Sequence, residues 1–255
     1  MRRVIAFACA GETLAGSLDE GSGETGLLIV TGGNEVRAGA HRGMAMLAAR
    51  LAADDIPVFR FDRRGVGDSS GSNSGYSGSR DDLIAAAEAF REHAPHITRL
   101  IGFGNCDAAS ALALFGRAAG LDALVLANPW VVEGGDDLPP AAAIRHRYAE
   151  RLRSPRAWAR LLAGGVDLRK LAKGLAKLTQ SAPQGLADQV VAAIASWGKD
   201  ARIILARDDN TAVAFAAAAA ARDLATRIEF VDTASHSFAR GADPAALEAA
   251  IRTAL

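Results

Sequence analysis

The chain has 255 residues, half of them hydrophobic, with 29 basic and 29 acidic side chains and therefore no formal net charge. This is the composition of an ordinary globular protein, and the neutral balance points to no polyanionic partner such as a nucleic acid. Two cysteines in a chain of this length exclude a disulfide framework, and no apolar run reaches the roughly 18 residues that a membrane span needs.

The N-terminal segment combines two arginines with a short apolar stretch over residues 4–10. Such a segment can be a short signal peptide or a first β-strand, and the polar turn that begins directly afterwards at Gly11 favours the strand. We therefore expect a cytoplasmic protein in which the segment through Leu18 forms an antiparallel hairpin at the edge of a sheet.

Strand-like and helix-like segments alternate along the rest of the chain. Short apolar runs predict strands at residues 27–30, 57–61, 100–103, 123–127, 202–206 and 227–231. Apolar residues at helical spacing predict helices at residues 44–51, 81–93, 105–119 and from 243 onward. The alternation predicts an α/β fold with a mostly parallel sheet, helices on both faces, and a ligand site beyond the carboxyl ends of the strands.

The alternation stops between residues 131 and 196, a stretch that is mostly helical in pattern. We interpret it as a helical cap inserted into a core formed by residues 1–130 and 197–255. The segment from Arg145 to Lys177 contains ten lysines and arginines but only two acidic residues, Glu150 and Asp167. Three interpretations stay open: a solvated cap helix packed over the site, a peripheral contact with an anionic membrane, or a site for an anionic, carrier-linked substrate.

The predicted strand at residues 100–103 runs into Gly104-Asn105-Cys106-Asp107-Ala108 and then a helix. This small-x-nucleophile-x-small pattern is typical of a nucleophile elbow, because the strained strand-to-helix turn leaves room only for small neighbours. The helix dipole at this point stabilises a thiolate. Cys106 could instead be a small buried core residue, but the strand–turn–helix context favours a nucleophile. Cys9 lacks that context, and we expect it to be structural.

A nucleophile of this kind requires a base, and the base requires an orienting acid. The elbow predicts the α/β-hydrolase fold, in which the acid and then the histidine follow the nucleophile along the chain. Asp208 and Asp209 compete for the acid after the next-to-last strand; we favour Asp209 and expect Asp208 to cap the following helix. His236 lies in the loop after the last strand, where it is either the catalytic base or an ordinary surface residue.

Backbone N–H groups are expected to hold the oxyanion. One belongs to Asp107, directly after the nucleophile. The other belongs to Gly33 or Asn34 in the glycine-rich loop after Val30, although a plain glycine turn would look the same. The sequence has no dinucleotide-binding fingerprint and no metal-ligand spacing, so we expect neither a cofactor nor a metal.

Several of these segments resemble the exosortase A system-associated hydrolases of the hydrolase 1 type. The resemblance covers most of the chain, and the cysteine–aspartate elbow is its most specific part. It implies an association with exopolysaccharide synthesis and PEP-CTERM protein sorting, without implying a substrate. The segments are Gly32–Asn34, Gly39–Arg42, Phe61–Ser69, Cys106–Ser110 and Arg156–Gly164.

Two hypotheses about function follow. In the first, a Cys106–His236–Asp209 triad hydrolyses a small-molecule or carrier-linked ester or thioester through an acyl-enzyme, or transfers the acyl group to another acceptor. In the second, the chain is a non-catalytic module with this fold that binds at a membrane surface through the basic cap.

Overall fold

The computed structural model describes residues 1–132, 185–222, 224 and 228–255. Eight strands of this part form one sheet in the order β1-β2-β4-β3-β5-β6-β7-β8. The strands are β1 (Arg2–Cys9), β2 (Glu12–Asp19), β3 (Thr25–Val30), β4 (Val58–Phe61), β5 (Arg99–Asn105), β6 (Ala123–Ala127), β7 (Ala201–Ala206) and β8 (Ile228–Val231). The α-helices are α1 (Gly43–Ala53), α2 (Arg80–His93), α3 (Asp107–Phe115), α7 (Leu186–Trp197), α8 (Asn210–Ala220) and α9 (Asp243–Arg252), with short 3-10 turns η1 (Ala40–Arg42), η2 (Tyr76–Gly78) and η3 (Gly198–Asp200).

The N-terminal hairpin predicted from the sequence is confirmed, with β1 and β2 antiparallel throughout. Ala10 and Gly11 join them at φ values of 49° and 85°, as a two-residue hairpin turn requires. β2 also pairs antiparallel with β4. Every later neighbour in the sheet is parallel, so the predicted mostly parallel sheet is confirmed as well.

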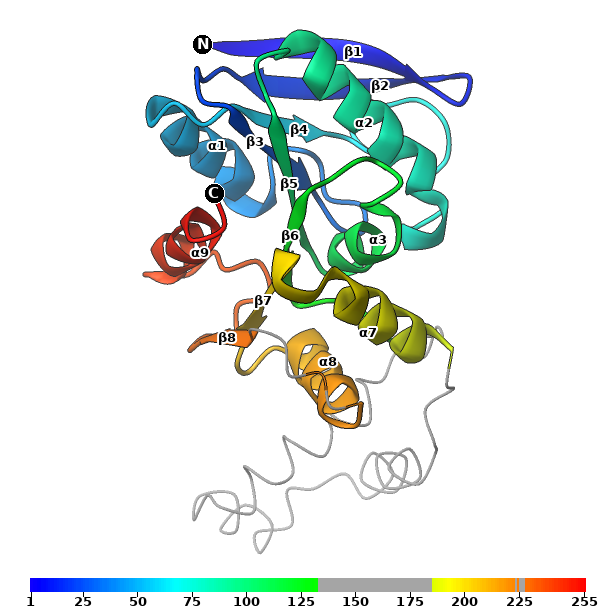
Figure 1. Cartoon of the computed structure of the whole chain (residues 1–255), viewed down its shortest axis with the longest axis vertical. Coiled ribbons are helices and arrows are strands. Elements are labelled where there is room, and N and C mark those ends of the chain that lie inside the picture. The colour runs from blue at the N-terminus through cyan, green and yellow to red at the C-terminus, as the bar shows by residue number, and fades with distance from the viewer. Residues whose placement is uncertain (133–184, 223, 225–227) are drawn as a thin grey trace, which may run out of the picture.

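Helices cover both faces of the sheet, and β3 shows why. Successive residues of a strand point to opposite faces, so Leu27 and Ile29 face one hydrophobic cluster whereas Leu28 and Val30 face another. The first cluster includes residues of α1 and α9, and the second includes residues of α2, α3, α7 and α8. In Figure 1 these two groups of helices lie on opposite sides of the sheet.

Helix α7 is the described end of the segment predicted as a cap. It packs against α3: the Trp197 Nε1–H donates to the Ala113 carbonyl (3.1 Å), and the Arg117 guanidinium lies 4.1 Å from the centre of the Trp197 ring. Residues 133–184, with most of the predicted cap and all of its basic stretch, lie outside the described residues, so both stay predictions. Among the helices that are described, none is long and apolar enough to cross a bilayer.

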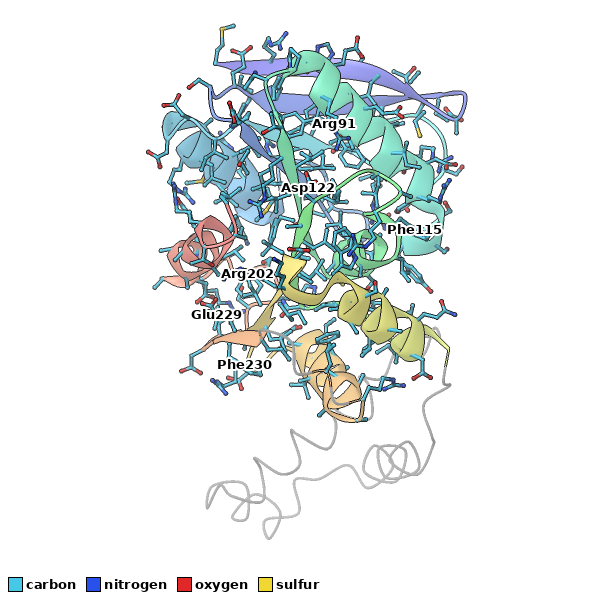
Figure 2. The ribbon with its side chains drawn as sticks, in the orientation of Figure 1. Arg91, Phe115, Asp122, Arg202, Glu229 and Phe230 are labelled. Carbon is cyan, nitrogen blue, oxygen red and sulfur yellow. The ribbon has the colours of Figure 1, made fainter. Side chains whose placement is uncertain are left out.

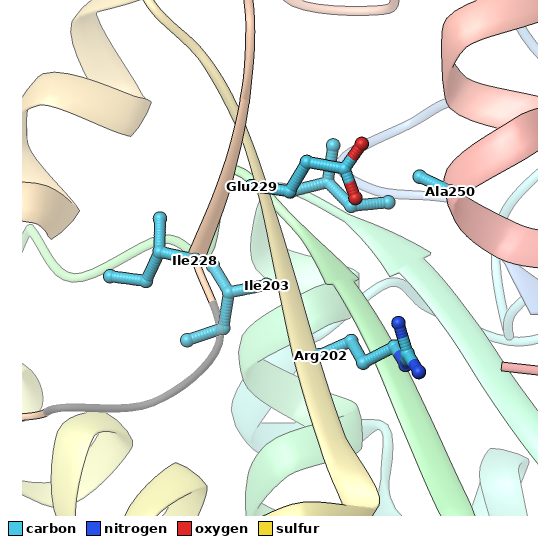
Figure 3. A pocket seen from close by; sticks show the side chains of 6 residues that line it. Arg202, Ile203, Ile228, Glu229 and Ala250 are labelled. Atoms are coloured by element: carbon cyan, nitrogen blue, oxygen red, sulfur yellow. The ribbon is translucent and has the colours of Figure 1, made fainter. Parts of the chain in front are cut away.

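Strand β8 forms the outer edge of the sheet. Phe230 is 46% exposed there, with the Arg207 guanidinium 5.0 Å from its ring centre (Figure 2). A shallow hollow between β7, β8 and α9 is lined by Arg202, Glu229 and Ala250 (Figure 3). It begins at the first residues of β7 and β8, whereas the predicted site residues follow the last residues of the strands.

Candidate active site

Cys106 lies at the turn between β5 and α3, directly after the last residue of the strand. Its backbone has φ 62° and ψ −129°, a conformation that residues other than glycine rarely adopt. Neighbouring backbone holds the turn: the Cys106 N–H donates to the Ala127 carbonyl (3.0 Å), and the Cys106 carbonyl accepts from the Trp130 N–H (3.2 Å). The half-buried thiol is therefore held at the carboxyl end of the sheet.

Small residues surround this turn for a steric reason. A Cβ added to Gly104 would lie 2.8 Å from Leu112 Cδ1 and 2.9 Å from the carbonyl carbon of Ala108. A Cβ added to Gly32, in the loop after β3, would lie 2.7 Å from the Asn105 carbonyl oxygen. Strand β5, helix α3 and this loop approach so closely that only glycine fits at both positions.

Of the two candidate acids, Asp209 is the one that contacts His236. Asp209 Oδ2 lies 3.0 Å from His236 Nδ1. The same oxygen accepts the backbone N–H groups of Thr211 and Ala212, each at 3.0 Å, so Asp209 is also the N-cap of α8. The expectation that Asp208 caps this helix is wrong, because Asp209 has the extended φ/ψ of an N-cap and the Asp208 side chain is exposed.

The electrostatics of the pair favour a charged imidazole. The hydrogen bond to Asp209, then a hydrogen bond with Cys106, raise the pKa of His236 to about 10 against the opposing effect of burial. Burial alone would raise the pKa of Asp209, but the hydrogen bond and charge of His236 and two backbone N–H groups outweigh it and lower that pKa. At neutral pH the imidazole next to Cys106 is therefore protonated and places a positive charge beside the thiol.

Two asparagines hold the His236 loop, and sequence reasoning missed both. The side-chain amides of Asn105 and Asn128 each donate to the His236 carbonyl at 3.1 Å. Asn128, fully buried with φ 42°, also accepts the Ala206 N–H at 2.9 Å. One signal was available: Asn128 is a polar residue directly after the apolar strand β6, at the edge of the sheet where the elbow lies.

The three residues expected to supply oxyanion donors also lie together, but one of their backbone N–H groups, that of Gly33, already has a hydrogen-bond acceptor. The Gly33 N–H donates to Asp107 Oδ1 at 2.6 Å, because the carboxylate of the residue after the nucleophile reaches across to the loop. The Asp107 N–H opens helix α3 and has no acceptor within the helix. Asn34 lies next to Gly33 in the exposed part of the loop.

Arg63, which the sequence analysis included only within the segment Phe61–Ser69 of the family resemblance, contacts this region directly. Its Nη2 donates to the Gly33 carbonyl (2.7 Å) and to Asp107 Oδ2 (3.1 Å), and its Nη1 donates to Ser79 Oγ (3.0 Å). The next arginine, Arg64, instead pairs with Asp82 of α2. The loop after β4 therefore supports both the site and helix α2.

A further carboxyl group, missed from the sequence, lies near the imidazole. Burial raises the pKa of Glu35 against the effects of the Ala40 N–H and of the His236 charge. Glu35 lines a small hollow with Thr31, Asn105 and Phe238, at the carboxyl ends of β3 and β5. The hollow thus adjoins both Cys106 and His236 along the chain, through Asn105 and Ser237.

The site brings together a thiol, an imidazole, an orienting carboxylate and backbone donors, which are the groups that acyl-transfer chemistry uses. In the described part of the chain no group of three or more His, Cys, Asp or Glu side chains is placed to hold a metal ion.

Comparison with known proteins identifies the family. The sequence model of the alpha/beta hydrolase family matches residues 28–250, which is most of the chain. No curated protein matches the sequence.

Several solved structures are similar in fold. An esterase from Pyrococcus furiosus is 15% identical with a TM-score of 0.66, and the match covers 100% of this chain and 90% of that one. A lidless serine hydrolase from Xanthomonas campestris is 19% identical with a TM-score of 0.59, covering 99% and 93%. The thioesterase domain of the curacin biosynthetic pathway is 14% identical with a TM-score of 0.59, covering 99% of each chain. At these identities the likeness establishes the fold alone, and the predicted fold class is confirmed.

Proposed function

The chain belongs to the alpha/beta hydrolase family, and from that premise we propose that it hydrolyses esters or thioesters with Cys106 as the nucleophile. One observation carries the proposal: the thiol lies on the strained turn after β5, in contact with a histidine that Asp209 holds at 3.0 Å. An esterase and a thioesterase among the similar structures agree with this choice of substrate class.

In the proposed first half-reaction, Cys106 Sγ attacks the carbonyl carbon as a thiolate, and the carbonyl π electrons move to its oxygen. The Asp107 N–H and an N–H of the loop after β3 stabilise that oxyanion. The oxyanion collapses, the bond to the leaving oxygen or sulfur breaks, and His236 gives its proton to the leaving group. An acyl group is then bound to Cys106 as a thioester.

In the second half-reaction, His236 takes a proton from water, and the hydroxide attacks the thioester. Collapse releases a carboxylic acid and restores the thiolate–imidazolium pair. The intermediate also reacts with amines and alcohols, so acyl transfer by the same triad is the alternative we retain. Asp209 keeps its charge throughout and stabilises the imidazolium.

The biological setting that we propose follows the resemblance described above. We place the enzyme in the cytoplasm, linked to exosortase systems and exopolysaccharide synthesis, with a small-molecule or carrier-linked acyl substrate. The basic segment at residues 145–177 would receive an anionic carrier or contact an anionic membrane.

The decisive experiment is alkylation by iodoacetamide between pH 5 and 9, read by mass spectrometry at each cysteine. Cys9 is an internal control, because burial, then the charge of Asp82 and a hydrogen bond to it, raise its pKa to about 11 and leave it a protonated thiol. We expect Cys106 to react faster than Cys9 at pH 6, and His236→Ala to slow the reaction of Cys106 about tenfold or more.

A positive result is followed by a screen of activated esters and thioesters, with Cys106→Ala as the inactive control. If Cys106 reacts no faster at pH 6 than Cys9 does, and His236→Ala changes nothing, the proposal is wrong. The non-catalytic membrane module would then be tested by co-sedimentation with anionic vesicles.

A further inference from the structure

A second aspartate stands directly beside the nucleophile, and the reaction described above does not use its side chain. Asp107 Oδ1 accepts the Gly33 N–H at 2.6 Å, and its Oδ2 accepts from Arg63 Nη2 at 3.1 Å. The Arg63 side chain is 2% exposed and that of Asp107 is 15% exposed. A buried guanidinium and a carboxylate therefore join the elbow to the loop from which the second oxyanion donor must come.

Arg63 also determines which way this loop presents its next peptide group. Its Nη2 donates to the Gly33 carbonyl at 2.7 Å, and the Asn73 side-chain amide donates to the same oxygen at 3.1 Å. A trans peptide is planar, so the Gly33 carbonyl and the Asn34 N–H point in opposite directions. Because the carbonyl points to a buried guanidinium, the Asn34 N–H points away from that guanidinium, and no hydrogen bond joins it to another described residue.

We propose that the Arg63–Asp107 pair is a positioning device for the oxyanion hole, and that it makes the Asn34 N–H, rather than the Gly33 N–H, the second donor. Asp107 Oδ1 engages the Gly33 N–H, and Arg63 orients the Gly33–Asn34 peptide. The inference rests on the proposed acyl chemistry of Cys106 and assigns the side chains that prepare its oxyanion hole.

The pairing also resolves an electrostatic conflict at the site. A carboxylate beside a developing oxyanion would oppose the charge that the reaction creates. The Arg63 guanidinium, 3.1 Å from that carboxylate, compensates its negative charge. Asp107 can thus hold the loop without acting as an uncompensated negative charge.

The test compares two reactions of Cys106 that differ in their need for an oxyanion hole. Acylation by p-nitrophenyl acetate passes through an oxyanion, and its rate is measured from the burst of released p-nitrophenolate. Alkylation by iodoacetamide forms none and reports only thiol reactivity. We expect Asp107→Ala to slow acylation about 100-fold, the effect of losing one oxyanion donor, and to change alkylation less than about threefold.

Two further variants test whether a slower acylation comes from the Asp107 side-chain contacts: the conservative change Asp107→Asn and the control Asp82→Asn. Asp107→Asn keeps an oxygen that can accept the Gly33 N–H, so we expect acylation within about tenfold of the wild type. Asp82→Asn breaks the pair that the next arginine of the same loop, Arg64, makes with α2. It is expected to lower stability without changing the ratio of acylation to alkylation.

Each other outcome overturns the inference in a recognisable way. Faster acylation in Asp107→Ala would mean that the carboxylate blocks the Gly33 donor instead of placing the Asn34 donor. An unchanged acylation rate would mean that the pair only stabilises the fold. A wild-type protein whose Cys106 is alkylated but never acylated would overturn the proposed function itself, and the inference with it. Should Asp107→Ala fail to fold, Asn73→Ala replaces it, because the exposed Asn73 side chain donates to the same Gly33 carbonyl. We expect this variant to slow acylation about fivefold, as the loss of one neutral hydrogen bond would. An unchanged acylation rate in Asn73→Ala overturns the inference.

Discussion

Two aspartates flank Cys106, and their partners differ in kind. Asp209 pairs with His236, whose side chain is 39% exposed and titratable, whereas Asp107 pairs with Arg63, which is 2% exposed and permanently charged. The first pair can gain or lose a proton during a reaction, and the second cannot. The same residue type is therefore suited to proton transfer on one side of the thiol and to holding backbone in place on the other.

The largest effect that would sharpen this comparison is expected at Asp209. Asp209→Asn removes the charge that stabilises the imidazolium, so we expect turnover to fall about 10³- to 10⁴-fold. Asparagine is as good an N-cap as aspartate, so the cap of α8 should be kept, and the free energy of unfolding should fall only by the contribution of the charge pair with His236. Steady-state kinetics on an activated ester and urea denaturation measure the two effects.

Asp209→Ala is the matched control, because it loses the charge and the cap of α8 together. We expect the same loss of activity with a further loss of about 1 kcal/mol in the free energy of unfolding. If Asp209→Asn kept more than a tenth of the activity, Asp209 would be a capping residue only, and the contrast with Asp107 would collapse.

The two sides of the thiol also differ in how far the sequence predicts them. The elbow, Asp209 and His236 were predictable because each occupies a fixed place relative to a strand, and strands are evident from apolar runs. The sequence puts Asp208 and Asp209 in the same turn, and the geometry at His236 is what separates them.

The Arg63–Asp107 contact was not predictable in the same way. The two residues are 44 positions apart, one in the loop after β4 and the other at the first residue of α3, and their approach depends on the packing of β3, β4 and β5. Periodicity carries no information on which of two adjacent arginines turns inward. Asn128 was predictable in part. Its position directly after β6 places a polar residue at the site, but the sequence does not predict that its side chain supports the His236 loop.

A smaller effect is expected from Asn128, which supports the histidine side alone. Asn128→Ala leaves the Ala206 N–H without its acceptor and removes one donor to the His236 carbonyl. We expect a loss of about 2–4 kcal/mol in the free energy of unfolding, because a buried backbone group is unpaired and alanine is strained at φ 42°. Urea denaturation measures it.

Asn105→Ala is the comparison for that variant, because the His236 carbonyl still has Asn128 as a donor. Its cost should be about 1 kcal/mol. Equal losses in the two variants would show that the asparagines act as one unit and that Asn128 has no special part in fixing the loop.

The smallest expected effect is in the pH dependence of stability, where the two pairs should behave differently. The pKa of His236 is raised from 6.5 to about 10, so the folded state binds more protons than the unfolded state between these values. The stabilisation from this pair is complete below pH 6.5 and is lost as the pH rises towards 10. We therefore expect the difference in unfolding free energy between the chain and its His236→Gln variant to shrink over that window.

The measurement is urea denaturation at pH 6, 7.5, 9 and 10, in a Cys106→Ser background so that the thiol does not titrate. Asp209, the larger cause of the raised pKa of His236, is still present in that background. Arg63→Gln supplies the contrast: it removes no group whose ordinary pKa lies between 6 and 9, so its cost should be the same over that range. A constant difference for His236→Gln as well would mean that Asp209 holds a neutral imidazole, and the two aspartates would then differ in position but not in kind.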